Sequence, residues 1–326
     1  MKQRKIGIRA VLLLLLGVTL GSARLISQPA THHDGGYFNR GQNAAWLSVD
    51  WVNAPHTNTE IKQLADDLVG HQITTVYVFT SYLKESGAFN PTFDHAEDFV
   101  KALRAATPEV SVQAWIGLPL SYVELSDEDV RAQIAAFSAE MVDGAGFDGI
   151  HLDPEPIYNG DADVLALLED VRNGLGANPT LSIATRRLWP LTPEREALVP
   201  GRWFWSASYY RLVAARVDEI AVMVYDSALP LPGAYRFWTK FQVIGLSRAL
   251  DRTGVTLFIG VPASEERTRT HRPAAENAKS GLKGVVDGLN DARSTPSAVT
   301  GIALYPYWEM DAADWTHYAQ RWEIEP

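Results

Sequence analysis

The chain has 326 residues and a net charge of −10 at neutral pH, and 46% of its residues are hydrophobic. This length and this hydrophobic content suffice for one large α/β barrel with a substantial core. The negative charge argues against nucleic acid as a partner, because no basic cluster follows the N-terminal segment. The sequence contains no Cys, which excludes disulfides, thiolate metal sites and a lipid-modified cysteine.

The N-terminus has the pattern of a secretory signal. Basic residues up to Arg9 precede an apolar run at residues 10–20, and Gly21-Ser22-Ala23 is small enough for cleavage. The apolar run is short for a membrane span. We therefore expect residues 1–23 to direct export, to a secreted, periplasmic or cell-envelope location. An uncleaved anchor that tethers the protein to a membrane is the alternative. Residues 24–41 have the polar character of a linker, which leaves 42–326 for the folded domain.

Eight apolar, β-rich runs recur at regular intervals after the linker. Continuous apolar runs suit strands that are buried on both faces, as in a parallel sheet. The runs are residues 44–50, 74–80, 110–117, 147–155, 180–185, 219–226, 256–261 and 301–307.

Amphipathic or helix-forming stretches fill the gaps between these runs. They cover residues 60–70, 95–106, 126–145, 161–175, 206–215, 235–252, 274–293 and 311–322. Eight strands that alternate with eight helices predict a single (β/α)8 TIM barrel.

The stretch at residues 147–156, which reads FDGIHLDPEP, carries the most chemistry. Side chains alternate along a strand, so His151, Asp153 and Glu155 share one face, with neighbours roughly 6.6 Å apart. Crowding of two carboxyls raises the pKa of one of them, which is what a general acid needs near neutral pH. The competing interpretation is an ordinary strand end, because acidic residues are common in turns.

A TIM barrel has its active site at the C-terminal ends of its strands. Acids and aromatics dominate these positions, and this mixture suits a carbohydrate because sugar rings stack on aromatic faces. We expect Asp50, Trp115, Asp226 and Trp308, together with His151, to contact the substrate. The eight His show neither HxH nor HExxH spacing, so we predict no metal site and no cofactor.

Residues 148–155, DGIHLDPE, resemble the DGxDxDxE signature of glycoside hydrolase family 18, the chitinase and endo-β-N-acetylglucosaminidase family. His151 stands where the family has its middle Asp. Residues 223–226, MVYD, resemble the family's MxYD motif on the sixth strand. The eighth strand is loosely similar to the one that carries the family's Trp beneath the reacting sugar. Counting residues from Gly301 puts that position at Tyr305. The Glu-x-Asp that follows the strand puts it at Trp308 instead, and we prefer Trp308.

The resemblance implies substrate-assisted, retaining hydrolysis, in which the substrate's N-acetyl oxygen attacks the anomeric carbon. Glu155 would then be the general acid and base, Asp153 would orient the acetamido group, and Tyr225 would bind its carbonyl. Asp226 would contact the sugar or tune Glu155. His151 would pair with Asp153 and favour its ionised form.

On this basis we expect an exported glycosidase that cleaves β-linked N-acetylglucosamine-containing glycans. The gap at residues 262–299 is too short for the insertion that some chitinases carry, which predicts a shallow cleft. Two alternatives stay open. One is a carbohydrate-binding barrel that has lost catalysis. The other is a retaining glycosidase whose nucleophile is a carboxylate such as Asp226 or Glu309, about 5 Å from the acid.

Overall fold

The computed structural model describes residues 38–189, 199, 201 and 203–323. The predicted export segment at residues 1–23 and most of the predicted linker at residues 24–41 lie outside this part of the chain. In the part that is described, no helix combines the length and the hydrophobicity that a membrane span requires.

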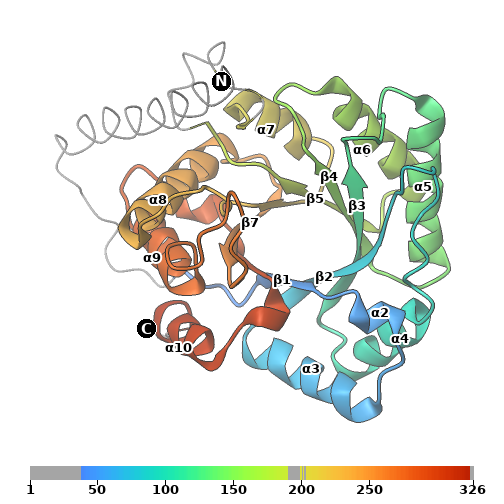
Figure 1. The fold of residues 1–326 in the computed structure, drawn as a ribbon, viewed down its shortest axis with the longest axis horizontal. Helices are drawn as coiled ribbons and strands as arrows, with labels where there is room; N and C mark the ends of the chain where they lie inside the picture. Colours follow the sequence, from blue (N-terminus) through green and yellow to red (C-terminus); the bar gives the residue numbers. More distant parts are fainter. Residues whose placement is uncertain (1–37, 190–198, 200, 202, 324–326) are drawn as a thin grey trace.

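Eight parallel strands close into a barrel in sequence order, with helices around the outside (Figure 1). The predicted (β/α)8 barrel is therefore confirmed. The strands are β1 (Asn43–Leu47), β2 (Ile73–Tyr82), β3 (Ser111–Pro119), β4 (Gly149–Glu155), β5 (Thr180–Thr185), β6 (Glu219–Val222), β7 (Thr256–Pro262) and β8 (Gly301–Tyr305).

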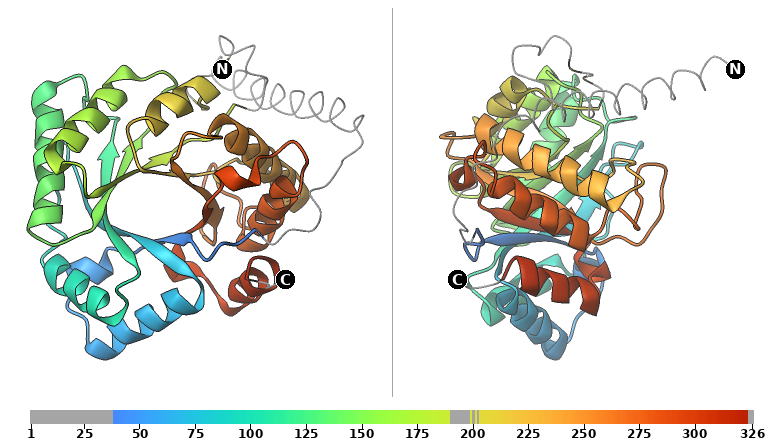
Figure 2. Two further views of the ribbon diagram at one scale, coloured as in Figure 1. Left: turned by 180° about the vertical axis from the view of Figure 1, so that it is seen from behind. Right: turned by 90° about the vertical axis from the view of Figure 1, so that its left-hand side faces the viewer.

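Helices pack against the outer face of the barrel along its whole circumference (Figure 2). The α-helices are α2 (Asp50–Asn53), α3 (Asn58–Gly70), α4 (Ala96–Ala106), α5 (Glu128–Asp143), α6 (Ala162–Leu175), α7 (Ala207–Ala214), α8 (Pro232–Ala249), α9 (Ala278–Leu289) and α10 (Ala312–Arg321). Two short 3-10 helices, η2 (Pro296–Ala298) and η3 (Tyr307–Glu309), flank β8.

The alternation of side chains along the strands creates two cores. Outward-facing residues such as Ile150 and Leu152 belong to the large cluster between strands and helices. Inward-facing aromatics, among them Trp46, Tyr77 and Trp115, fill the barrel interior. Filling of the interior by side chains is the rule for this architecture, so only the two ends of the barrel are open to a ligand.

Three local differences from the predicted elements affect the site. β1 ends at Leu47, so Asp50 begins the short helix α2 instead of ending a strand. β6 ends at Val222, which puts Tyr225 and Asp226 in the following loop. That loop is strongly curved, because Asp226 has a φ of 57°.

The segment between β7 and β8, all of which is described, contains only α9 and η2 as helices. This agrees with the predicted lack of a chitinase-type insertion.

Candidate active site

β4 carries the predicted acid pair to the C-terminal end of the barrel. Asp153 pairs in register with Gly117 of β3, and Glu155 pairs with Pro119. On its other side β4 approaches β5 very closely at Gly149. A Cβ there would lie 2.3 Å from the carbonyl oxygen of Thr180, so only Gly fits. Gly149 thereby allows the close packing of β4 against β5, and β4 is the strand that carries both acids.

Asp153 is held by a single indole. Nε1 of Trp115 donates to Oδ2 of Asp153 over 3.0 Å, and Oδ1 is buried with no partner among the described residues. Burial, reinforced by the charge of Glu155, raises the pKa of Asp153 to about 8, and the Trp115 hydrogen bond opposes this rise. Because Oδ2 accepts from the indole, the proton of neutral Asp153 belongs on Oδ1. Burial therefore favours the neutral form of Asp153, whereas the family resemblance led us to expect the ionised form.

Glu155 reaches solvent at the barrel mouth while protein atoms surround it on its other sides. This partial burial raises its pKa; Arg186 and Arg187 oppose the rise, and Asp226 adds to it. A carboxyl with a raised pKa and access to solvent has the properties of a general acid.

Tyr225 lies close to both acids. Burial raises the pKa of its phenol well above 10, and the charges of Asp153 and Glu155 contribute to this rise. The ring is buried and stacks on Tyr305, with ring centroids 5.3 Å apart and an interplanar angle of 9°. Tyr225 is thus a permanent hydroxyl donor next to the acid pair.

Tyr305, at the end of β8, forms the floor of the mouth. Its ring meets Trp115 at a centroid distance of 6.2 Å and Trp46 at 5.7 Å. Burial and the charge of Asp153 raise its pKa to about 12. Trp308 lies 6.2 Å from Tyr305 and is 48% exposed, which places it at the rim. The geometry therefore favours Tyr305 over Trp308 as the residue beneath a bound sugar, contrary to the sequence-based preference.

His151 is not part of the mouth. It is fully buried, and its ring nitrogens bond to Trp46 and Ser182 instead of Asp153. The predicted pairing with Asp153 is wrong, and a residue with no exposed surface cannot bind substrate directly. The strand pattern placed His151 on the correct face, but it lies one layer deeper in the barrel interior.

Asp50 lies on the loop side of β1, and its carboxylate accepts from the hydroxyl of Ser48 over 2.8 Å. Asp50 contacts Ser48 and also His56, whose ring bonds to the Asp50 carbonyl oxygen. They do not connect it to the acid pair.

A buried ion pair supports the loop after β6, and no motif in the sequence indicates it. Nδ1 of His271 lies 3.6 Å from Asp226 and 3.5 Å from Glu276, and Glu276 has no exposed surface. Burial disfavours the charged imidazole, but its interactions with Asp226 and Glu276 outweigh this and raise its pKa to about 10. Arg187 adds two hydrogen bonds to the same loop, to the carbonyls of Tyr225 (2.7 Å) and Asp226 (2.5 Å).

The ligand atoms of Asp226, His271 and Glu276 lie within 4.8 Å of one another, so the group has the composition of a metal site. Nε2 of His271 donates to the carbonyl of Ser264 over 2.9 Å, so Nδ1 is the nitrogen that faces both carboxylates. The two carboxylates favour the protonated form of the imidazole. The group acts as an ion pair that anchors the Tyr225–Asp226 loop.

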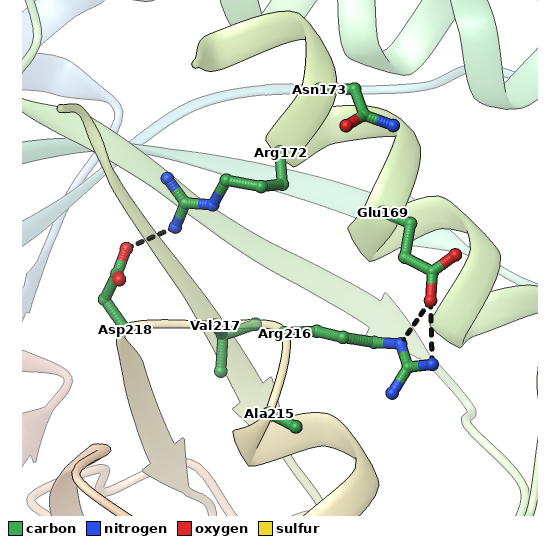
Figure 3. Close-up of a pocket in the computed structure, with 7 residues that line it drawn as sticks. All are labelled: Glu169, Arg172, Asn173, Ala215, Arg216, Val217 and Asp218. Atoms are coloured by element: carbon green, nitrogen blue, oxygen red, sulfur yellow. Dashed lines mark hydrogen bonds and ion pairs between the residues drawn. The ribbon is translucent and has the colours of Figure 1, made fainter. Parts of the chain in front are cut away.

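A surface hollow at the opposite end of the barrel is lined by charged residues from α6 and from the loop before β6 (Figure 3). Its charges are already paired: Arg172 bonds to Asp218, and Arg216 bonds to Glu169. Asp218 also accepts from the backbone N–H of Leu181. These pairs close the N-terminal end of the barrel, where TIM barrels carry stability and not catalysis.

No family model matches the sequence, and no curated protein matches it significantly. Solved structures do match. A class V chitinase from Pseudomonas fluorescens Pf-5 superimposes with a TM-score of 0.58 at 14% identity, over 89% of this chain and 100% of that one. A chitinase from Cycas revoluta in complex with (GlcNAc)3 gives a TM-score of 0.56 at 15% identity, over 86% and 99%. The spore cortex-lytic enzyme SleL of Bacillus cereus gives 0.55 at 12%, over 87% and 75%.

The chain has the chitinase-like fold of glycoside hydrolase family 18. At these identities the likeness concerns the fold, and it confirms at that level the resemblance expected from residues 148–155. In the chitinase-like barrel, the structure brings Asp153, Glu155, Tyr225 and Trp115 together at one end.

Proposed function

We propose that the protein is a glycoside hydrolase that cleaves N-acetylglucosamine-containing glycans by substrate-assisted, retaining catalysis. The observation that carries the proposal is the acid pair Asp153 and Glu155, which lies beside the phenol of Tyr225 at the C-terminal mouth of a chitinase-like barrel. The similar structures include a Cycas revoluta chitinase with bound (GlcNAc)3 and a chitinase from the same organism with allosamidin. This similarity supports an N-acetylglucosamine-containing glycan as the substrate.

In the first step, Glu155 donates its proton to the glycosidic oxygen as the bond from that oxygen to the anomeric carbon breaks. The electron pair of the broken bond leaves with the glycosidic oxygen, which the Glu155 proton neutralises. A lone pair of the acetamide oxygen forms the new bond to the anomeric carbon and gives a cyclic oxazolinium. In the second step, water attacks the anomeric carbon and Glu155 takes a proton from that water. The bond from the acetamide oxygen to the anomeric carbon breaks, which restores the acetamide.

The neighbours of Glu155 hold the reacting acetamide. Tyr225 donates its hydroxyl to the acetamide carbonyl, since its raised pKa keeps it protonated at any working pH. Asp153 contacts the other side of the acetamide through Oδ1, the oxygen that has no described protein partner. Tyr305 provides the apolar floor under the sugar ring.

Export remains part of the proposal. A basic segment followed by an apolar run at residues 10–20 supports an extracytoplasmic location, where such glycans are found in cell walls.

The mechanism can be tested with two β-1,4-linked tetrasaccharides that differ only at C2. Chitotetraose carries acetamides at this position, and cellotetraose carries hydroxyls. Substrate assistance predicts cleavage of the first and not the second, with oxygen-18 from labelled water at the new reducing end and retained anomeric configuration. Equal cleavage of both would replace this mechanism by attack of a carboxylate such as Asp226. Binding of chitotetraose without cleavage would indicate a carbohydrate-binding barrel.

A further inference from the structure

Two loops at the C-terminal end of the barrel bring three potential metal ligands together. Asp226 follows β6, whereas His271 and Glu276 follow β7. Nδ1 of His271 lies 3.6 Å from Oδ1 of Asp226 and 3.5 Å from Oε2 of Glu276, and the three atoms lie within 4.8 Å of one another. Neither HxH nor HExxH spacing describes this group, because its members come from two separate loops.

The separations from Nδ1 are long for hydrogen bonds and suit a shared metal ion. A charge-assisted hydrogen bond between a cationic imidazole and a carboxylate is about 2.7–2.9 Å long. Two ligand atoms that each lie about 2.1 Å from a tetrahedral zinc ion are roughly 3.4 Å apart. The observed 3.5 Å and 3.6 Å are close to the second value. The Asp226 side chain is 52% exposed, so its carboxylate has room to approach that of Glu276.

The other polar partners of His271 and Glu276 orient the ligand atoms. Nε2 of His271 donates to the carbonyl of Ser264 over 2.9 Å, which turns Nδ1 toward the carboxylates. The Ser227 hydroxyl donates to Oε1 of Glu276 over 2.8 Å, and its N–H donates to Oε2 over 3.2 Å. Oε2 keeps a second lone pair for a metal. A metal-bound His usually donates its other N–H to a carbonyl or carboxylate, as His271 does.

A buried phenol beside the group also indicates a ligand. Tyr235 on α8 has no exposed surface, and its hydroxyl has no hydrogen-bond partner among the residues that the structure describes. Burial raises the pKa of this phenol well above 10, and Glu276 is the charged group that adds most to the rise. The hydroxyl is therefore near Glu276, where a water on a bound metal would give it the partner that a buried donor needs.

The charges of the group match a divalent cation. Asp226 and Glu276 supply two negative charges, and His271 binds a metal as a neutral ring after Nδ1 has released its proton to solvent. Arg187 bonds to the backbone carbonyls of Tyr225 and Asp226 in the same loop. One imidazole nitrogen and two carboxylate oxygens form a ligand set that zinc accepts, with water as the fourth ligand. Calcium and magnesium prefer six or more oxygen ligands.

We propose that Asp226, His271 and Glu276 bind one zinc ion that joins the loop after β6 to the loop after β7. Without zinc, the three side chains form the ion pair described above, and the metal takes the place of the Nδ1 proton. Bound zinc stabilises the loop that carries Tyr225. The proposal is independent of the proposed glycosidase activity, and its test requires no turnover.

Calorimetric titration of the metal-free, untagged full-length chain with zinc tests the site. We expect one zinc per chain, and a Tm that rises by about 5 °C when free zinc reaches a hundred times Kd. His271→Gln and Glu276→Gln should each weaken binding by at least about a hundredfold. The proposal would be overturned if the native chain bound no zinc, or if both variants kept the native affinity.

The adjacent His32 and His33 in the N-terminal segment provide a matched control. Replacing both with Gln makes the same chemical change as His271→Gln, and this double variant should keep the native zinc affinity. Loss of binding in it would overturn the proposal. X-ray absorption spectroscopy of the zinc-loaded native chain needs no variant to fold. It should show a single imidazole with oxygen ligands at about 2.0–2.2 Å, and two or more imidazoles per zinc would overturn the proposal.

Discussion

The indole nitrogen of Trp115 lies 3.0 Å from Oδ2 of Asp153, so a tryptophan on β3 holds one oxygen of a carboxyl group on β4. The other oxygen, Oδ1, is buried without a described partner. A buried polar atom with no partner is costly, and in the proposed mechanism the substrate acetamide becomes the partner of Oδ1.

Trp115→Phe should lower kcat on chitotetraose roughly tenfold, which is about the worth of one hydrogen bond. The physical reason is that Asp153 loses its orienting donor and its pKa rises further. Steady-state kinetics measure this. Trp315→Phe makes the same chemical change on α10, where the ring stacks on His71, and should leave kcat unchanged. Equal losses in the two variants would contradict a specific role for the Trp115 indole.

Asp153→Asn should stabilise the protein increasingly as the pH rises. The pKa of Asp153 is raised from 3.8 to about 8, so the native state binds its proton more tightly than the unfolded state does. The native enzyme therefore loses stability between about pH 4 and pH 8, and the variant does not. The difference in Tm between variant and native enzyme should grow over this interval and level off above it. A difference that is independent of pH would refute the raised pKa.

Glu276→Ala should destabilise the fold by about 1–3 kcal/mol, because the His271 cation then keeps Asp226 as its one carboxylate partner among the described residues. It also removes the acceptor of the Ser227 hydroxyl, which lies 2.8 Å from Glu276. Urea unfolding of Glu276→Ala, His271→Ala and the double variant measures the coupling. We expect about 1–3 kcal/mol of interaction energy. Strict additivity would mean that the two side chains do not form an ion pair.

Gly149→Ala should cost about 1–3 kcal/mol, since its new methyl would meet the Thr180 carbonyl and force β4 away from β5. Activity should fall with it, because Asp153 and Glu155 move with the strand. Gly70→Ala on α3, where nothing lies within 4 Å of the added methyl, is the control and should be neutral or stabilising. Equal melting curves for the two variants would show that β4 is not confined at this point.

The sequence was most informative where the structure is periodic. Continuous apolar runs located all eight strands, and the period of two put Asp153 and Glu155 on one face of β4. Depth along that face could not be read from the pattern. It depends on which neighbours fill the barrel, and Trp46 and Ser182 take both nitrogens of His151.

The support of the site was beyond sequence reasoning for a related reason. His271 and Glu276 belong to the loop after β7, and they meet Asp226 because β7 pairs with β6 and brings the two loops together. The choice between Tyr305 and Trp308 likewise depended on where β8 ends. η3 turns the chain immediately after Pro306 and carries Trp308 to the rim.

Glu155→Gln tests most directly whether Glu155 supplies the proton for glycosidic cleavage. Turnover of chitotetraose and binding of the same sugar by calorimetry should be measured on the native protein and the variant together. We expect a loss of kcat of about 10² to 10⁴, with nearly unchanged affinity because the change is isosteric. A variant that retains full turnover on chitotetraose would contradict it.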